Sequence, residues 1–147
     1  MRTGGPIQIL LVEDSPSDVL ATREAVKESK LSCELQVVED GAEALAFLRR
    51  EGRYTSVPTP DLVLLDWNLP RKDGREVLME IKSDEHLRLI PVVVLTSSMA
   101  SGDVIRAYGL HANCCITRPA DFKRLVEVVS AINHFWFDVV TLPSRGP

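Results

Sequence analysis

The stretch DLVLLDWNLP, residues 61–70, contains four consecutive apolar residues, Leu62 to Leu65, followed at once by the carboxylate of Asp66. The apolar run has the length of a strand and does not alternate with polar residues, which is typical of a parallel strand covered by helices on both faces. A polar residue directly after such a strand lies at the carboxyl edge of the sheet, where open parallel sheets bind their ligands. The stretch therefore predicts a fold class and the position of a site.

Working outward, four further apolar runs have strand length: Ile7–Val12, Cys33–Val38, Val92–Leu95 and Cys114–Ile116. The segments between and after these runs have the spacing of apolar residues that is typical of helices. The first predicted helix starts at Ser15-Pro16, and the other four span Gly41 to Arg50, Gly74 to Ser83, about Gly102 to Tyr108, and Asp121 to about Val140. We expect Ser15 and Asp121 to be N-caps and Gly52 to stop the second helix. Strand and helix in alternation predict an α/β fold with one parallel sheet; only the proline-bearing loop Arg53–Pro60 departs from the pattern.

The length of 147 residues suits a single domain, with a core from about residue 7 to 140 and short tails. The net charge is −4 and the basic residues are scattered, which argues against direct DNA binding. No apolar run is long enough to span a membrane and the N-terminus lacks a signal peptide, so we expect a cytoplasmic protein. Cys33, Cys114 and Cys115 lack a metal-type spacing and are interpreted as small buried apolar side chains.

Polar residues with the chemistry of a site follow the first, third, fourth and fifth predicted strands and should meet at one edge of the sheet. They are Glu13 and Asp14 after the first strand, Asp66 after the third, Thr96 and Ser97 after the fourth, and Thr117 and Arg118 after the fifth. Three converging carboxylates repel one another unless a cation neutralises them, and oxygen ligands suit Mg²⁺. With that charge offset, one carboxylate can attack phosphorus. Any one acid alone could merely cap the next helix.

Three segments resemble the receiver domain of two-component response regulators: LLVED at 10–14, LVLLDWNLPRKDG at 62–74 and PVVVLTSS at 91–98. The resemblance implies a flavodoxin-like (βα)5 fold, a doubly wound parallel sheet with strand order 2-1-3-4-5. It implies that Asp66 accepts a phosphoryl group from a sensor histidine kinase and that Thr96 and Arg118 contact that group. Mg²⁺ would be held by Glu13, Asp14, Asp66 and the backbone carbonyl of Asn68. Such a protein assists its own phosphorylation and dephosphorylation but is not a multiple-turnover enzyme.

A closer resemblance is to the small receivers that partner bacterial phytochrome-type histidine kinases. It is carried by the loop around Tyr54 to Pro60, the stretch NLPRKDGREVL at 68–78 and the tail FWFDVVTLP at 135–143. In such proteins the last helix and tail are similar to a dimer-forming element. Phe135, Trp136 and Phe137 are consecutive, so one helical face cannot bury all three, and we expect a homodimer through them. A wide core face at the helix end is the alternative.

Two positions depart from the receiver pattern. Arg118 stands where receivers usually carry Lys, and Cys115 stands where they often carry an aromatic residue that changes rotamer. A degenerate receiver, or a phosphate sink that acts by partner binding, is therefore the alternative function. An aspartyl-nucleophile hydrolase is disfavoured because the position two after Asp66 is Asn68, whose amide cannot transfer a proton. A flavin-binding module is disfavoured because Glu13 and Asp14 would repel its phosphate.

Overall fold

The fold is a five-stranded sheet covered by helices on both faces. The computed structural model describes residues 6–29, 32–69, 72–96, 101–117, 119 and 121–143. Its strands are β1 (Ile7–Val12), β2 (Cys33–Val38), β3 (Leu62–Asp66), β4 (Val92–Thr96) and β5 (Cys114–Thr117). They pair in parallel in the order β2-β1-β3-β4-β5, which confirms the predicted sheet.

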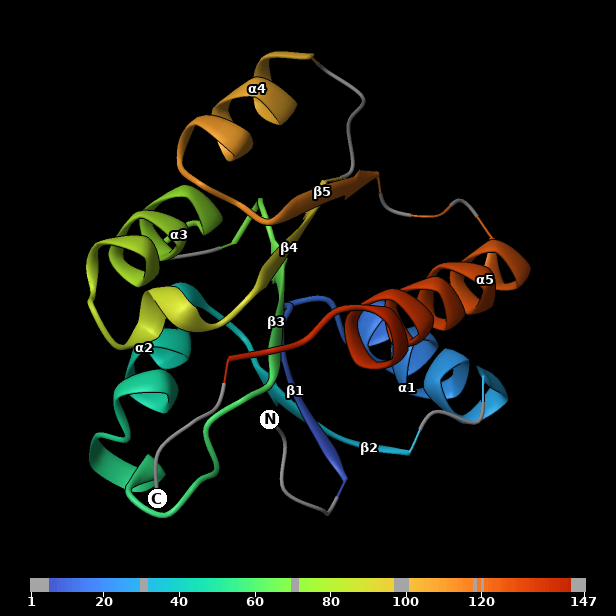
Figure 1. Cartoon of the computed structure of the whole chain (residues 1–147), viewed down its shortest axis with the longest axis horizontal. Helices are drawn as coiled ribbons and strands as arrows, with labels where there is room; N and C mark the ends of the chain where they lie inside the picture. The colour runs from blue at the N-terminus through green and yellow to red at the C-terminus, as the bar shows by residue number, and fades with distance from the viewer. Residues whose placement is uncertain are drawn as a thin grey trace.

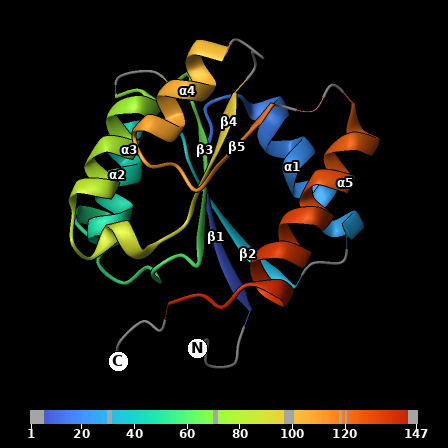
Figure 2. The same cartoon turned by 45° about the horizontal axis from the view of Figure 1, so that its top comes forward.

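The helices form two layers, one on each face of the sheet. They are α1 (Pro16–Ser29), α2 (Gly41–Arg49), α3 (Gly74–Ser83), α4 (Ser101–Gly109) and α5 (Phe122–Asn133). Figure 1 shows α1 beside α5 on one face and α2 beside α3 on the other, and Figure 2 shows the sheet between these layers. Among the described residues, none of the helices combines the length and the apolar character that a membrane span requires.

The apolar strands divide their side chains between two core clusters. In β1, Ile9 and Leu11 belong to the cluster under α1 and α5, whereas Leu10 and Val12 belong to the cluster under α2 and α3. Successive side chains of a strand point to opposite faces, and here both faces are covered by apolar helices. The absence of alternation in the sequence is explained by this two-sided burial.

The helix boundaries agree with two of the three predicted signals. The Asp121 side chain accepts a hydrogen bond from the Arg124 amide at 2.8 Å, and the Ser15 hydroxyl accepts one from the Asp18 amide at 3.4 Å. The prediction that Gly52 stops α2 is wrong. Arg50 instead takes the left-handed conformation at φ 57° and ends the helix, because its amide reaches back to the Phe47 carbonyl at 3.1 Å. Gly52 begins the 3-10 turn η1 (Gly52–Tyr54).

The last predicted helix reaches the expected position but changes geometry on the way. After α5 the chain continues as a π-helical turn, η3 (His134–Val139). Trp136 and Phe137 pack against the core cluster under α1 and α5, while Phe135 is 49% exposed. The wider π turn brings neighbouring side chains closer to one face, so two of the three aromatic residues contact the core. The chain then runs below the sheet in the view of Figure 2, towards the side of α2, and Leu142 helps to line a cavity of about 280 Å³.

Candidate metal centre at the carboxyl edge of the sheet

Three carboxylates meet where β1 and β3 end. Glu13 and Asp14 follow β1, Asp66 is the last residue of β3, and these strands are direct neighbours in the sheet. One carboxylate oxygen from each residue lies within 4.8 Å of the others. Glu13 and Asp66 are buried, at 2% and 6% exposure, whereas Asp14 is exposed to solvent. The cluster is therefore open on the Asp14 side and closed on the side of the core.

The backbone around the cluster is fixed by hydrogen bonds. The Glu13 amide donates to the Val38 carbonyl at 3.0 Å, and the Glu13 carboxylate accepts from the Ser15 amide at 3.1 Å. The Asp66 carboxylate accepts from the Asn68 amide at 3.2 Å. These bonds hold two of the three carboxylates in defined orientations, so the group is arranged before any ligand binds.

The donor chemistry of the cluster fits a hard divalent cation. The group consists only of carboxylates, and oxygen ligands suit Mg²⁺ and Mn²⁺. Three negative charges this close repel one another, and a bound dication offsets that repulsion. The Asn68 backbone carbonyl was predicted as a further ligand. The Asn68 amide donates to the Asp66 carboxylate, which places Asn68 beside the cluster. The role of its carbonyl as a metal ligand stays a prediction.

Thr96 belongs to the same edge of the sheet. It ends β4, which lies next to β3, and it is only 1% exposed. Of the other predicted site residues on the neighbouring strands, Thr117 ends β5 directly opposite Thr96. Ser97 and Arg118 lie outside the described residues.

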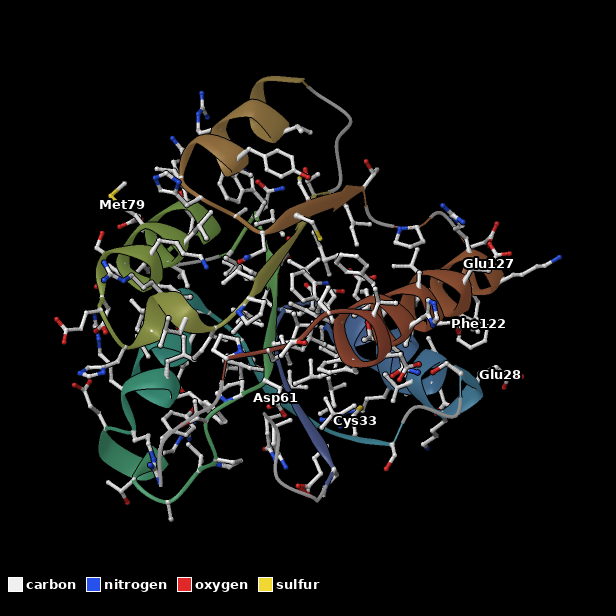
Figure 3. The ribbon with its side chains drawn as sticks, in the orientation of Figure 1. Glu28, Cys33, Asp61, Met79, Phe122 and Glu127 are labelled. Atoms are coloured by element: carbon white, nitrogen blue, oxygen red, sulfur yellow. The ribbon has the colours of Figure 1, made fainter. Side chains whose placement is uncertain are left out.

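The other aspartate of the opening stretch, Asp61, lies at the opposite end of β3 (Figure 3). It is buried at 3% exposure, and its carboxylate accepts a hydrogen bond from the Gln8 amide at 2.7 Å. Its own amide donates to the Gln8 carbonyl, also at 2.7 Å. Asp61 thus ties the start of β3 to β1, which is a structural role away from the carboxylate cluster.

Gly74, the first residue of α3, also contributes to this site, although the sequence pointed to it only as a helix start and as the end of the receiver-like segment 62–74. Its amide donates to the Trp67 carbonyl at 3.2 Å. A Cβ at this position would lie 2.6 Å from the Asp66 carbonyl oxygen and 2.8 Å from the Trp67 Cα. The turn after β3 therefore packs directly on the helix start, and only glycine leaves room for it.

The cysteines take no part in the metal cluster. No disulfide links Cys33, Cys114 and Cys115, all of which lie in the described part of the chain and are half-buried. Burial raises the pKa of the Cys114 thiol to about 11, with a smaller contribution from the neighbouring Cys115. Burial also raises the pKa of Cys33. The Cys33 and Cys114 thiols therefore stay protonated at neutral pH, and all three cysteines are half-buried rather than fully buried as the sequence predicted.

Cys115 is contacted from outside the sheet by an aromatic residue of α4. The Cys115 amide donates a hydrogen bond to the Tyr108 hydroxyl at 3.2 Å. β5 is the last strand in the sheet order, and this hydrogen bond links it to α4. Tyr108 thereby joins α4 to the edge of the sheet one strand away from Thr96.

Comparisons with known proteins identify this arrangement. A family model for the response regulator receiver domain matches residues 9–130. The chain is 50% identical over 139 residues to the response regulator Rcp1 of Synechocystis sp., covering 95% of each protein. The crystal structure of the Mn²⁺-bound form of Rcp1 superposes with a TM-score of 0.86, covering 95% of this chain and all of that one. The crystal structure of the phosphorylated cyanobacterial phytochrome response regulator RcpA gives a TM-score of 0.89 at 48% identity, with the same coverage.

Proposed function

The chain belongs to the response regulator receiver family, and from this premise we propose that Asp66 is the residue that accepts the phosphoryl group from a sensor histidine kinase. The observation that carries the proposal is the cluster of Asp66 with Glu13 and Asp14, whose carboxylate oxygens lie within 4.8 Å of one another. Of the three residues, Asp66 ends the central strand β3 and is joined to the α3 start through the turn that Gly74 packs against.

The proposed reaction is a transfer between two nucleophiles. A carboxylate oxygen of Asp66 attacks the phosphorus of a phosphohistidine, the P–N bond breaks, and an acyl phosphate forms while the histidine leaves with its electron pair. Glu13, Asp14, Asp66 and the Asn68 carbonyl would hold Mg²⁺, which supplies charge compensation for the carboxylates and the phosphoryl oxygens. The Thr96 hydroxyl and the Arg118 guanidinium would donate hydrogen bonds to the transferred group.

Loss of the phosphoryl group is proposed to be slow. Hydrolysis of the acyl phosphate needs a water molecule that is deprotonated as it attacks. Asn68 is exposed two residues after Asp66, and its amide cannot accept that proton. The chain therefore stores the group and is not a multiple-turnover hydrolase.

A phosphotransfer assay with Asp66→Asn tests the assignment. We expect the wild-type protein to take up label from a phosphorylated sensor kinase in the presence of Mg²⁺ and Asp66→Asn to take up none. Asp138→Asn is a matched control, since Asp138 is an exposed acid on η3, far along the chain from the cluster. Labelling of Asp66→Asn, or an unlabelled wild type with every kinase tried, would refute the proposal.

We propose that the donor is a phytochrome-type histidine kinase. The support is the 48% identity to RcpA, which is itself a cyanobacterial phytochrome response regulator. Initial rates of transfer from a phytochrome-type kinase and from unrelated sensor kinases, measured under identical conditions, compare the candidates. Equal rates from all donors would contradict a dedicated phytochrome partner.

A receiver that acts as a phosphate sink or a plain binding partner is the second candidate, and Cys115 favours it. The small thiol lies where receivers often carry a mobile aromatic residue, and Tyr108 instead binds the Cys115 amide from α4. Amide hydrogen exchange before and after phosphorylation distinguishes the two functions. Altered exchange in α4 and β5 indicates a conformational switch, whereas exchange unchanged beyond the site indicates a sink.

We also propose a homodimer built on the last helix and η3. Phe135 is 49% and Val139 58% exposed on η3, and such apolar exposure suits a partner surface. Trp136 and Phe137 contact their own core, so Phe135 is the aromatic residue left for the partner. Light scattering over a range of concentrations tests this: Phe135→Ser should shift the mass towards the monomer. A wild-type mass that stays monomeric at every concentration would remove the dimer.

We further propose that the chain works as one receiver domain in the cytoplasm, without direct contact to DNA. The family match over residues 9–130 supports the single domain. The cysteines form no disulfide with one another, which suits a reducing compartment, and the net charge of −4 disfavours nucleic acid. Retarded migration of a DNA probe by the purified protein at physiological salt would contradict the last point.

A further inference from the structure

The turn between β3 and α3 directly follows Asp66 and contains Asn68, two of the residues proposed to hold Mg²⁺. Its first half is held by the sheet and the helix start, since the Trp67 amide donates to the Leu95 carbonyl at 2.9 Å and Gly74 packs on Trp67. Trp67 and Leu69 are buried in the core at 5% and 9% exposure. Lys72, two residues before the start of α3, is held by a separate set of contacts.

The backbone of Lys72 lies against the first residue of α2. A Cβ on Gly41 would be 2.0 Å from the Lys72 carbonyl oxygen and 2.6 Å from a methyl group of Val77. No side chain fits between the two segments, so the start of α2 and the turn are in direct backbone contact. This contact limits how far Lys72 can move towards α2.

The side chain of Lys72 is fixed by one carboxylate on α3. Its ammonium lies 2.5 Å from one oxygen of Glu80, and the guanidinium of Arg49, the last residue of α2, lies 3.3 Å from the other oxygen. The Lys72 hydrogen bond is the main reason why the pKa of Glu80 is lowered, with Arg49 adding to it. Each of the three side chains is about one third exposed, at 34% or 35%.

We propose that Glu80 is a positioning residue of the phosphorylation site, because it holds Lys72 beside the start of α3, where Gly74 packs on Asp66 and Trp67. This inference rests on the proposed function. An ion pair this exposed adds little to global stability. Its contribution is orientation, since groups that align metal ligands change metal affinity even when they do not touch the metal.

The test is a calorimetric titration of Mg²⁺ into metal-free wild type and variants, which compares their affinities for the ion. We expect Glu80→Gln and Lys72→Met each to weaken Mg²⁺ binding about threefold to tenfold, with thermal unfolding of the metal-free protein unchanged. The double variant should be no weaker than the weaker single one, because both changes break the same link. Lys72→Arg, which can still reach Glu80, should bind Mg²⁺ like the wild type.

Glu127→Gln is the control, since it breaks a more exposed Glu–cation pair, with Arg124 at 3.3 Å on α5, and should leave Mg²⁺ binding unchanged. If wild type binds Mg²⁺ and both single variants bind it equally well, the role of Glu80 is overturned while the function of Asp66 stands. If either Glu80→Gln or Lys72→Met unfolds at a lower temperature than wild type, the Mg²⁺ affinity of the other variant decides the role of Glu80. A wild type that neither binds Mg²⁺ nor becomes labelled overturns the proposed function and this inference together.

Discussion

At the scale of single residues, the site depends on close backbone packing as well as on carboxylates. Gly41 and Gly74 are the first residues of α2 and α3, and both lie where a Cβ would overlap the turn after β3. Neither has a positive φ, so the reason for glycine at these positions is lack of space. The turn that presents Asp66 is therefore enclosed by two helix starts.

Gly74→Ala tests this packing. The added methyl group would lie 2.6 Å from the Asp66 carbonyl oxygen, so backbone must shift, and we expect a loss of about 1–3 kcal/mol in unfolding free energy. Mg²⁺ affinity should fall as well, because the shifted backbone carries Asp66. Urea denaturation and Mg²⁺ titration measure the two effects.

Gly109→Ala is the control, since nothing lies within 4 Å of a Cβ at that position. Its stability should be unchanged or higher by up to about 1 kcal/mol. If both variants lose stability equally, the packing explanation for Gly74 is wrong.

Arg118→Lys tests the departure at the position of the usual lysine. Lys carries a compact charge on a flexible stem, whereas guanidinium is planar and bulkier, so contact with the phosphoryl group should differ. We expect a change in the rate of phosphoryl uptake or in the lifetime of phosphorylated Asp66. Uptake of label and its later loss over time measure these two steps. Unchanged kinetics in both steps would count against a role for Arg118.

At the scale of elements, the C-terminal segment joins two helical geometries with different tasks. α5 follows the regular pattern and buries Val129 and Ile132, and η3 then widens. The rings of Phe135 and Trp136 contact each other edge to face, with their centroids 5.3 Å apart. Trp136 nevertheless packs on the core, whereas Phe135 is exposed. Adjacent residues in the sequence are thus assigned to the core and to the surface.

Trp136→Ala and Phe135→Ala separate these tasks. Trp136 is partly buried against the core, so its truncation should cost about 2 kcal/mol in unfolding free energy, less than for a fully buried tryptophan. Phe135→Ala should cost less than about 1 kcal/mol but lower self-association. Urea denaturation at a low protein concentration and light scattering at higher ones measure the pair. An equal loss of unfolding free energy in both variants would contradict the assignment of Trp136 to the core and Phe135 to the surface.

At the scale of the whole molecule, the parallel sheet concentrates negative charge at one edge. Glu13, Asp14 and Asp66 come from distant parts of the chain and meet because β1 and β3 are neighbours that end together. Cation binding there is thermodynamically linked to folding, because an unfolded chain does not hold the three carboxylates together.

Mg²⁺ should therefore stabilise the fold. At a concentration ten times the dissociation constant we expect about 1.4 kcal/mol of added unfolding free energy, and a chelator should remove it.

Asp14→Asn should weaken Mg²⁺ binding at least about tenfold. The same variant should stabilise the metal-free protein by up to about 1 kcal/mol, because it removes one of three like charges. Thermal unfolding with and without Mg²⁺ gives both values. Equal Mg²⁺ stabilisation of wild type and Asp14→Asn would contradict the proposed ligand set.

Local patterns in the sequence were enough to predict the strands, their parallel arrangement and the edge at which Glu13, Asp14, Asp66 and Thr96 would meet. These features follow from local patterns, because an unbroken apolar run defines a buried parallel strand and the next polar residue marks its end. The sequence also predicted the caps at Ser15 and Asp121, which depend on neighbours a few residues away.

Contacts between elements could not be predicted from local patterns. The pairing of Glu80 with Lys72 and Arg49, the contact of Gly41 with Lys72, and the hydrogen bond from Cys115 to Tyr108 each depend on how two elements pack. The left-handed stop at Arg50 and the π turn of η3 likewise depart from the local pattern. Spacing along a chain fixes which face of a helix is apolar, but the distance and angle between helices come from the packing of all their side chains at once.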